Sequence, residues 1–195
     1  MAMRPVSSAR LRGSDGAAGV RRVMKSVCAA EPQAVVLALD GALAAAAVEA
    51  GRAEHCSAQY VVFSETGATL LATRRASATG LHPLAGLLVA QVMPSPTNLS
   101  HPLVAEYQRA LLMQGEGVKA TQASYPSIEG YQAMRVLIEA LRLCHRDPSG
   151  RCLQQMLLSR SLDLPGLRVQ FGAAQRQPHP FVEMTLLDAW GRLQR

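Results

Sequence analysis

The stretch AVVLALDGALAAAAVEAGRAEH, residues 34–55, is followed after three residues by QYVVF at 59–63, and this succession decides the fold. AVVLAL is a short continuous apolar run, which is typical of a strand buried on both faces. Asp40-Gly41 then turns the chain into an alanine-rich segment whose small side chains let a helix pack closely on a sheet. QYVVF predicts the next strand.

The same alternation continues on either side of this stretch. Residues 14–30 predict a helix that Pro32 ends, residues 66–76 predict a helix after the second strand, and residues 84–92 predict a third strand. Strands and helices that alternate with short connections favour an α/β fold. We therefore predict a three-layer parallel sheet with helices on both faces.

The segment QVMPSPTNLS, residues 91–100, interrupts this alternation. The next predicted elements are helices at 100–112, at 125–143 and after Asp147-Pro148-Ser149, followed by strands within 167–171 and 181–188. Helices without strands of their own need another surface to pack on. We therefore predict a second lobe, with a hinge crossing at Gln91, Pro94 and Pro96 and a return near Ser159–Pro165. A proline-containing surface loop at 91–100 fits the periodicity equally well.

Composition and charge narrow the class of protein. The chain has 195 residues, of which 49% are hydrophobic, so it can build a sizeable core. Its formal net charge is +6, but the basic residues are spread along the sequence, and this favours a solvated surface over a nucleic-acid site. No stretch reaches the roughly 18 apolar residues of a membrane span. The first residues lack the apolar core of a secretory signal.

The four cysteines stand at Cys28, Cys56, Cys144 and Cys152. We interpret them as buried thiols that pack as small apolar side chains. A disulfide between Cys144 and Cys152, in an oxidising compartment, is the alternative. Zinc binding by Cys144, His145 and Cys152 lacks a fourth ligand and the usual spacing, so no metal site is predicted.

Candidate binding residues follow the predicted strands, because open α/β sheets bind ligands beyond the carboxyl ends of their strands. Asp40-Gly41 follows the first strand, and Ser64-Glu65 follows the second. Each of these residues can also serve to begin a helix, and for Asp40 a helix cap is the simpler interpretation. Glu65 is the better candidate for pairing with an ammonium group. The sequence contains no nucleotide-binding, hydrolase or metalloprotease motif, so neither an enzyme nor a cofactor is predicted.

Four segments of the sequence, in the same order along the chain, resemble the type 1 solute-binding proteins of ABC importers. The resemblance is to the branch that binds leucine, isoleucine and valine. The segments are EPQAVVLALDGALAAAAVEAGRA (31–53), QVMPSPTNLSHPLVAEYQRAL (91–111), SYPSIEGYQAMRVLIEALR (124–142) and GLRVQFGAAQRQPHPFVEMTLLD (166–188). The resemblance implies two α/β lobes with a solute bound between them. It assigns 1–90 and 165–195 to the second lobe, and 91–164 to the interlobe crossing and the helical part of an incomplete first lobe.

The resemblance also implies function. It implies ligand contacts from residues that follow the strands of the second lobe, which is where Asp40, Gly41, Ser64 and Glu65 stand. Glu65 matches an acidic position that meets an ammonium group, and Ser64 lies beside it. An aromatic residue often found after the preceding strand in this family is Ala42 here. It further implies a periplasmic receptor that passes a small-molecule solute, an amino acid or small carboxylate, to a membrane permease. Without a signal peptide, a cytoplasmic location is the alternative.

Most of the first lobe of this family has no counterpart in the chain. The helices at 101–143 would then lack the sheet that they normally cover, and they would expose an apolar stripe. We therefore predict a truncated solute-binding component of an ABC importer, which binds ligand without chemistry. The alternative is a ligand-independent sensory or regulatory module that forms a homodimer through the same lobe.

Overall fold

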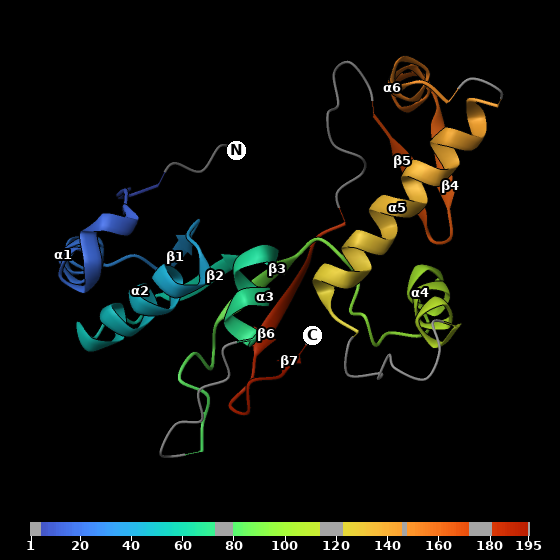
Figure 1. Ribbon diagram of the computed structural model, residues 1–195. Helices are drawn as coiled ribbons and strands as arrows, with labels where there is room; N and C mark the ends of the chain where they lie inside the picture. The colour runs from blue at the N-terminus through green and yellow to red at the C-terminus, as the bar shows by residue number, and fades with distance from the viewer. Residues whose placement is uncertain (1–4, 73–79, 114–122, 146–147, 172–180, 195) are drawn as a thin grey trace. The chain divides into compact units, whose positions relative to one another are not determined.

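The chain forms two compact units in the computed structural model, which describes residues 5–72, 80–113, 123–145, 148–171 and 181–194 (Figure 1). Unit 1 consists of residues 1–91 and 184–195, and unit 2 consists of residues 92–183. Both contain helices and strands, so the predicted α/β class is confirmed. No helix within the described ranges is both long enough and apolar enough to cross a bilayer.

The sheet of unit 1 has five strands in the order β1-β2-β3-β6-β7. They are β1 (Ala34–Leu37), β2 (Gln59–Phe63), β3 (Leu88–Gln91), β6 (Glu183–Leu187) and β7 (Leu193–Gln194). β1, β2 and β3 pair in parallel, as predicted, and β6 and β7 form an antiparallel hairpin. β3 is shorter than the strand predicted at 84–92, because the backbone bends at Gly86, where φ is +85°.

The turn between β6 and β7 is organised by Asp188. Its carboxylate accepts hydrogen bonds from the backbone N–H groups of Trp190 at 2.9 Å and Arg192 at 2.8 Å, and from Gln194 Nε2 at 2.9 Å. Partial desolvation raises the pKa of Asp188, but these bonds to the charged form outweigh it and bring the pKa to about 2. β7 was not predicted from the sequence, because a strand of two residues shows no periodicity.

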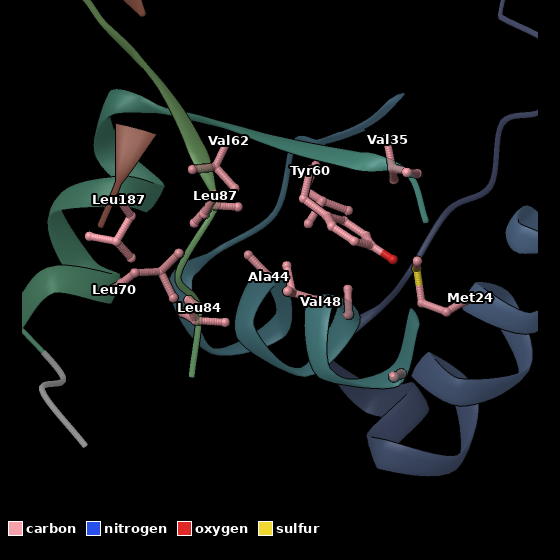
Figure 2. Close-up of a cluster of buried hydrophobic side chains, with 14 of the residues drawn as sticks. Met24, Val35, Ala44, Val48, Tyr60, Val62, Leu70, Leu84, Leu87 and Leu187 are labelled. Carbon is pink, nitrogen blue, oxygen red and sulfur yellow. The ribbon is translucent and has the colours of Figure 1, made fainter. Parts of the chain in front are cut away.

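The helices of unit 1 cover one face of this sheet. They are the 3-10 turn η1 (Gly13–Asp15) and the α-helices α1 (Gly16–Cys28), α2 (Gly41–Ala53) and α3 (Ser64–Ala72). Residues 73–76 of the helix predicted at 66–76 lie outside the described residues. The core between sheet and helices is shown in Figure 2 and contains Met24, Val48, Tyr60, Val62 and Leu187.

The opposite face of the sheet is exposed. Burial alternates along β1, where Val35 and Leu37 are buried but Val36 is 62% exposed. The prediction that this strand is buried on both faces was therefore wrong. Of the three layers predicted, the described residues of unit 1 form two.

Unit 2 contains three helices and a hairpin. Its elements are α4 (Pro102–Met113), α5 (Tyr125–Leu143), α6 (Gly150–Ser159), β4 (Ser161–Leu164) and β5 (Leu167–Gln170). One core joins α4 to the start of α5 through Leu103, Tyr107 and Ile128. Another packs Ala140 of α5 against Leu162 of the hairpin.

The β4–β5 hairpin corrects two predictions. The segment Ser159–Pro165, expected to return to the other lobe, instead contains β4, which pairs antiparallel with β5. Unit 2 therefore has strands of its own and extends to residue 183, whereas the sequence analysis placed residues 165–195 together in the α/β lobe. The physical reason is that the apolar residues of β4 and β5 bury themselves on α5.

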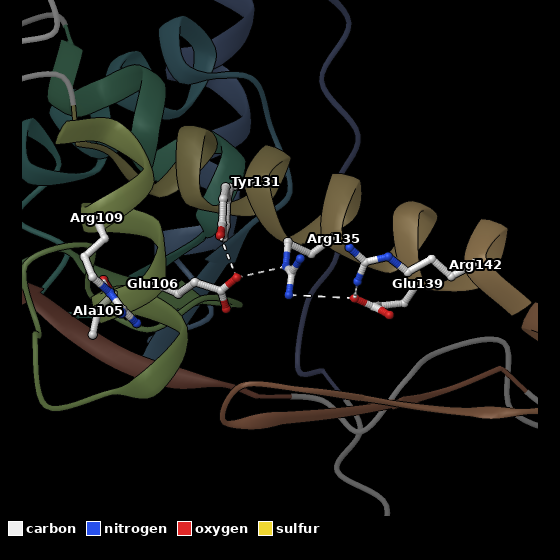
Figure 3. Close-up of polar contacts among 7 residues, drawn as sticks. All are labelled: Ala105, Glu106, Arg109, Tyr131, Arg135, Glu139 and Arg142. Atoms are coloured by element: carbon white, nitrogen blue, oxygen red, sulfur yellow. Dashed lines mark hydrogen bonds and ion pairs between the residues drawn. The ribbon is translucent and has the colours of Figure 1, made fainter. Parts of the chain in front are cut away.

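A row of polar contacts runs along α5 (Figure 3). Tyr131 donates to Glu106 Oε1 at 3.0 Å, and Arg135 Nε lies 3.0 Å from the same oxygen. Glu139 in turn contacts Arg135 at 3.8 Å and Arg142 at 2.7 Å. Burial and then the bond to Glu106 raise the pKa of Tyr131. These contacts join α4 to α5.

The apolar stripe predicted on α5 is divided between buried and exposed positions. Ile128 is buried against α4. Met134 and Ile138 are 54% and 38% exposed. The helix therefore presents an apolar ridge to solvent in the described part of the chain, as the sequence analysis expected for helices without their sheet.

All four cysteines are paired, so the interpretation as buried thiols was wrong. Cys28 at the end of α1 bonds to Cys56, which follows α2, and Cys144 at the end of α5 bonds to Cys152 in α6. The Cα–Cα separations are 5.5 Å and 5.9 Å. Each bond therefore ties together two helices that are consecutive in its unit.

Candidate functional site

A hollow of about 520 Å³ lies at the carboxyl ends of β1 and β2 in unit 1. Residues 38–42, which follow β1, form one side of it. Phe63, Glu65 and Thr66, at the junction of β2 and α3, form the other. Parallel neighbouring strands bring these two segments together, because their carboxyl ends meet at one edge of the sheet.

Asp40 both caps a helix and lines the hollow. Its Oδ1 accepts a hydrogen bond from the backbone N–H of Leu43 at 2.9 Å, and its backbone is extended, so it is the N-cap of α2. The predicted cap is thus confirmed. Because the side chain is also exposed, its negative charge is available at the hollow.

Glu65 enters the hollow from the first turn of α3. A carboxylate at this position is favoured by the partial positive charge of the helix N-terminus. Thr66, 6% exposed, donates from Oγ1 to the carbonyl oxygen of Leu39 at 2.6 Å. This bond fastens the start of α3 to the segment that carries Asp40, so the two acidic residues share one hollow.

Phe63 is a lining residue that the sequence analysis missed. It is the last residue of β2 and is 48% exposed. The aromatic side chain expected after the first strand is replaced by Ala42, which also lines the hollow. The available signal was the aromatic residue that directly precedes Ser64-Glu65 in the sequence.

Ser64 and Gln91 are placed differently from the other predicted residues. Ser64 is 8% exposed and donates from its hydroxyl to Gln91 Oε1 at 2.9 Å. Neither residue is among those that line the hollow. Gln91 is fully buried at the end of β3. The pair therefore connects the start of α3 to the end of β3.

The predicted hinge residues lie on both sides of the division between the units, which falls after Gln91. Pro94 and Pro96 are buried in unit 2. The carbonyl oxygen of Pro96 accepts a hydrogen bond from Gln108 Nε2 at 2.6 Å, which fastens the segment to α4. Movement about this segment stays a prediction.

None of the four described histidines, His55, His82, His101 and His145, lines the hollow. His82 accepts a hydrogen bond at Nδ1 from the backbone N–H of Leu84 at 3.2 Å, and the ring of His101 meets Phe181 edge to face. Among the residues that the structure describes, no three histidine, cysteine or acidic side chains gather as a metal site would require. The hollow therefore offers two carboxylates and a volume of about 520 Å³ for binding a small molecule.

Comparison with known proteins identifies the fold of the chain. No protein-family model matches the chain, and no curated protein matches it. Solved structures do. A substrate-binding periplasmic protein from Ralstonia solanacearum shares 26% identity with a TM-score of 0.67, covering 90% of this chain and 49% of its own. An extracellular ligand-binding receptor from Verminephrobacter eiseniae EF01-2 shares 20% identity with a TM-score of 0.69, covering 92% and 49%.

A third solved structure shares this fold. It is named as a possible leucine/isoleucine/valine-binding protein, from Rhodopirellula baltica SH 1, and shares 22% identity with a TM-score of 0.68, covering 84% of this chain and 42% of its own. All three are named as receptors or binding proteins and none as an enzyme, in agreement with the predicted absence of catalysis. The chain therefore has the fold of the type 1 periplasmic ligand-binding proteins of ABC importers, which its sequence resembles, and it spans about half the length of these structures.

Proposed function

We propose that this chain is a solute-binding component of an ABC importer, in truncated form, for branched-chain or related amino acids. The solute binds in the hollow of unit 1 and undergoes no chemistry. The observation that carries the proposal is that Asp40 and Glu65, from two neighbouring strand ends, line one hollow of about 520 Å³. The similarity to a protein named as leucine/isoleucine/valine-binding supports the same class of ligand.

The chemistry of the hollow suits a small zwitterion. The carboxylates of Asp40 and Glu65 attract an ammonium group. The N-termini of α2 and α3 begin beside the hollow, and free N–H groups at a helix start favour a carboxylate. Phe63 and Leu39 supply apolar surface for an aliphatic side chain. An amino acid carries all three kinds of group.

A periplasmic location and a membrane permease as partner belong to this proposal. The structures that share the fold are named as extracellular, periplasmic or ABC-transporter proteins. The two disulfides support an oxidising compartment, because reducing cytosols keep most thiols unpaired. The chemistry of the hollow offers no reason for a nucleic acid to bind there.

The test is thermal unfolding with a panel of amino acids and small carboxylates, at two protein concentrations. A ligand that binds only the folded protein stabilises it by about 2.7 kcal/mol when its concentration is a hundred times Kd. We expect leucine, isoleucine or valine to raise Tm. Isothermal titration then measures Kd for wild type, Glu65→Gln and Asp40→Asn.

Asp40→Asn and its control separate charge from folding. Asparagine caps helices about as well as aspartate, so this variant keeps α2 and removes only the charge. Glu54→Gln, at the other end of α2 and exposed, is the matched control. We expect weaker binding for Asp40→Asn and Glu65→Gln and wild-type binding for Glu54→Gln. Absence of any ligand shift, or equal affinity for all four proteins, contradicts the proposal. A Tm that rises only with protein concentration supports the ligand-independent module.

A further inference from the structure

The exposed face of the unit 1 sheet is largely apolar. Side chains on the helix-covered face, such as Val35, Val62, Val89 and Leu187, belong to the core. The residues between them point the other way, because successive side chains in a strand alternate between faces. The large exposed ones are Val36 at 62%, Phe63 at 48%, Met184 at 46% and Leu186 at 42%.

Strand pairing joins these side chains into one surface, which we call the bare face. Val36 lies opposite Val61, which lies opposite Leu88, and Phe63 lies opposite Ala90. β6, which carries Met184 and Leu186, follows β3 in the sheet. The bare face therefore extends across four consecutive strands.

Among the residues that the structure describes, the bare face carries no ionisable side chain. Its members are Ala34, Val36, Gln59, Val61, Phe63, Leu88, Ala90, Met184 and Leu186. The chain as a whole has a net charge of +6, so a surface that attracted an acidic partner would be expected to display arginines. In a two-fold dimer the same surface meets itself, and like charges would then oppose each other. A charge-free surface avoids this repulsion, which favours a second copy as the occupant.

The area of the bare face is consistent with such a contact. At these exposed fractions, the four large side chains present roughly 400 Å² of surface, about the size of the largest apolar patch on a typical monomer, which is often functional. A stable dimer buries about 800 Å² on each partner, and its apolar centre is surrounded by a polar rim. The bare face thus has the size of the centre of a dimer interface.

We propose that the bare face is a homodimer interface, in which two copies pack sheet on sheet about a two-fold axis. Val36, Phe63, Met184 and Leu186 of each copy become buried between the two sheets. Sheets that pack face to face do so about 10 Å apart through apolar side chains of this kind. The interface shares Phe63 with the hollow, so the dimer is measured without added amino acid, and its failure can be told apart from a failure of the proposed solute binding.

Methionine oxidation tests the proposal in the wild-type protein. Met184 lies on the bare face at 46% exposure, and Met134 lies on α5 of unit 2 at 54% exposure. Peroxide oxidises accessible methionines, and peptide mass spectrometry gives the rate for each. Over about a hundredfold range of protein concentration, we expect oxidation of Met184 to slow as the dimer forms while that of Met134 stays constant. Sedimentation velocity under the same conditions reports the dimer directly.

Two substitutions test the same face. Met184→Lys places an unpaired charge in the interface, and we expect it to raise the dimer Kd by about a hundredfold. Val36→Lys, on another strand, is expected to do the same. Met134→Lys makes the same chemical change on α5 and is expected to leave Kd unchanged. Circular dichroism at low concentration checks that each variant folds.

Several outcomes overturn the proposal. A monomer at every concentration would mean that the bare face has another occupant or none. Equal slowing of oxidation at Met184 and Met134 would place the contact elsewhere or make it nonspecific. A dimer weakened by Met134→Lys but not by the variants of the bare face would assign the interface to α5.

Discussion

Gly67→Ala offers a direct test of how closely α3 packs on the sheet. Gly67 lies within α3, and a Cβ atom there would overlap the side chain of Val89, which is 1% exposed on β3. Overfilling a packed core costs about 1–3 kcal/mol. Alanine in place of glycine within a helix stabilises the folded state by about 1 kcal/mol. Packing therefore outweighs helix propensity, and we expect unit 1 to lose about 1 kcal/mol of stability.

Gly130→Ala is the matched control. Gly130 lies within α5, and a Cβ atom there would meet no other atom within 4 Å. Only the helix propensity changes, so we expect unit 2 to gain about 0.5–1 kcal/mol. The same substitution thus has opposite signs in the two helices.

Hydrogen exchange measured by mass spectrometry separates the two units, which need not unfold in one step. A loss of about 1 kcal/mol corresponds to roughly fivefold faster exchange. We expect this in β2 peptides of Gly67→Ala, and slower exchange in α5 peptides of Gly130→Ala. Slower exchange of β2 in Gly67→Ala would refute the reasoning, because it would mean that Val89 moves aside at little cost.

Two further predictions concern the disulfides and the β6–β7 turn. Replacing Cys28 and Cys56 by alanine is expected to destabilise unit 1 by about 3.5 kcal/mol, and replacing Cys144 and Cys152 to destabilise unit 2 by about 2.5 kcal/mol, because the first bond closes the longer loop. Denaturant unfolding that shows the reverse order contradicts this account. The carboxylate of Asp188, with its pKa lowered from 3.8 to about 2, stabilises the hairpin above pH 3.8 and loses this contribution as the pH falls through 2. An NMR acid titration of β7 should show the transition in wild type and not in Asp188→Asn.

The sequence predicted the positions of the helices and strands better than it predicted which of their faces are covered. The strand at 59–63 and the helix at 125–143 have the predicted bounds, because each has a clear period and a clear cap or turn beside it. The exposed face of β1 could not be predicted. Apolar residues such as Val36 occupy both faces, and sequence alone does not reveal whether another layer is present to cover them.

β4 was missed for a different reason. Its sequence, SLDL, has the alternation of a strand, but four residues are too few to distinguish from a connection. Pro165-Gly166, where Gly166 has a φ of +70°, is a turn signal between β4 and β5. Interpreting it as a hairpin turn would have placed residues 161–170 in one unit.

The sequence predicted where the candidate site lies, but only some of the residues that line it. Asp40, Gly41 and Glu65 line one hollow because parallel strands end at a common edge. Ser64, one residue before Glu65, instead points toward Gln91. Which of two consecutive residues faces the hollow depends on where the first turn of α3 begins. A shift of one residue in that start changes which side chain is presented.

Unit 2 is inserted into unit 1, and this arrangement has a consequence for the order of folding. Residues 92–183 are contiguous, so unit 2 can fold as soon as it leaves the ribosome. Unit 1 must wait for β6, since Leu187 is part of its core and Thr185 bonds to the carbonyl oxygen of Val89 across 96 residues. Closing so long a loop is slow, and until then the edge of β3 stays open. During synthesis, a nascent unit 1 is therefore the part that a chaperone would have to protect.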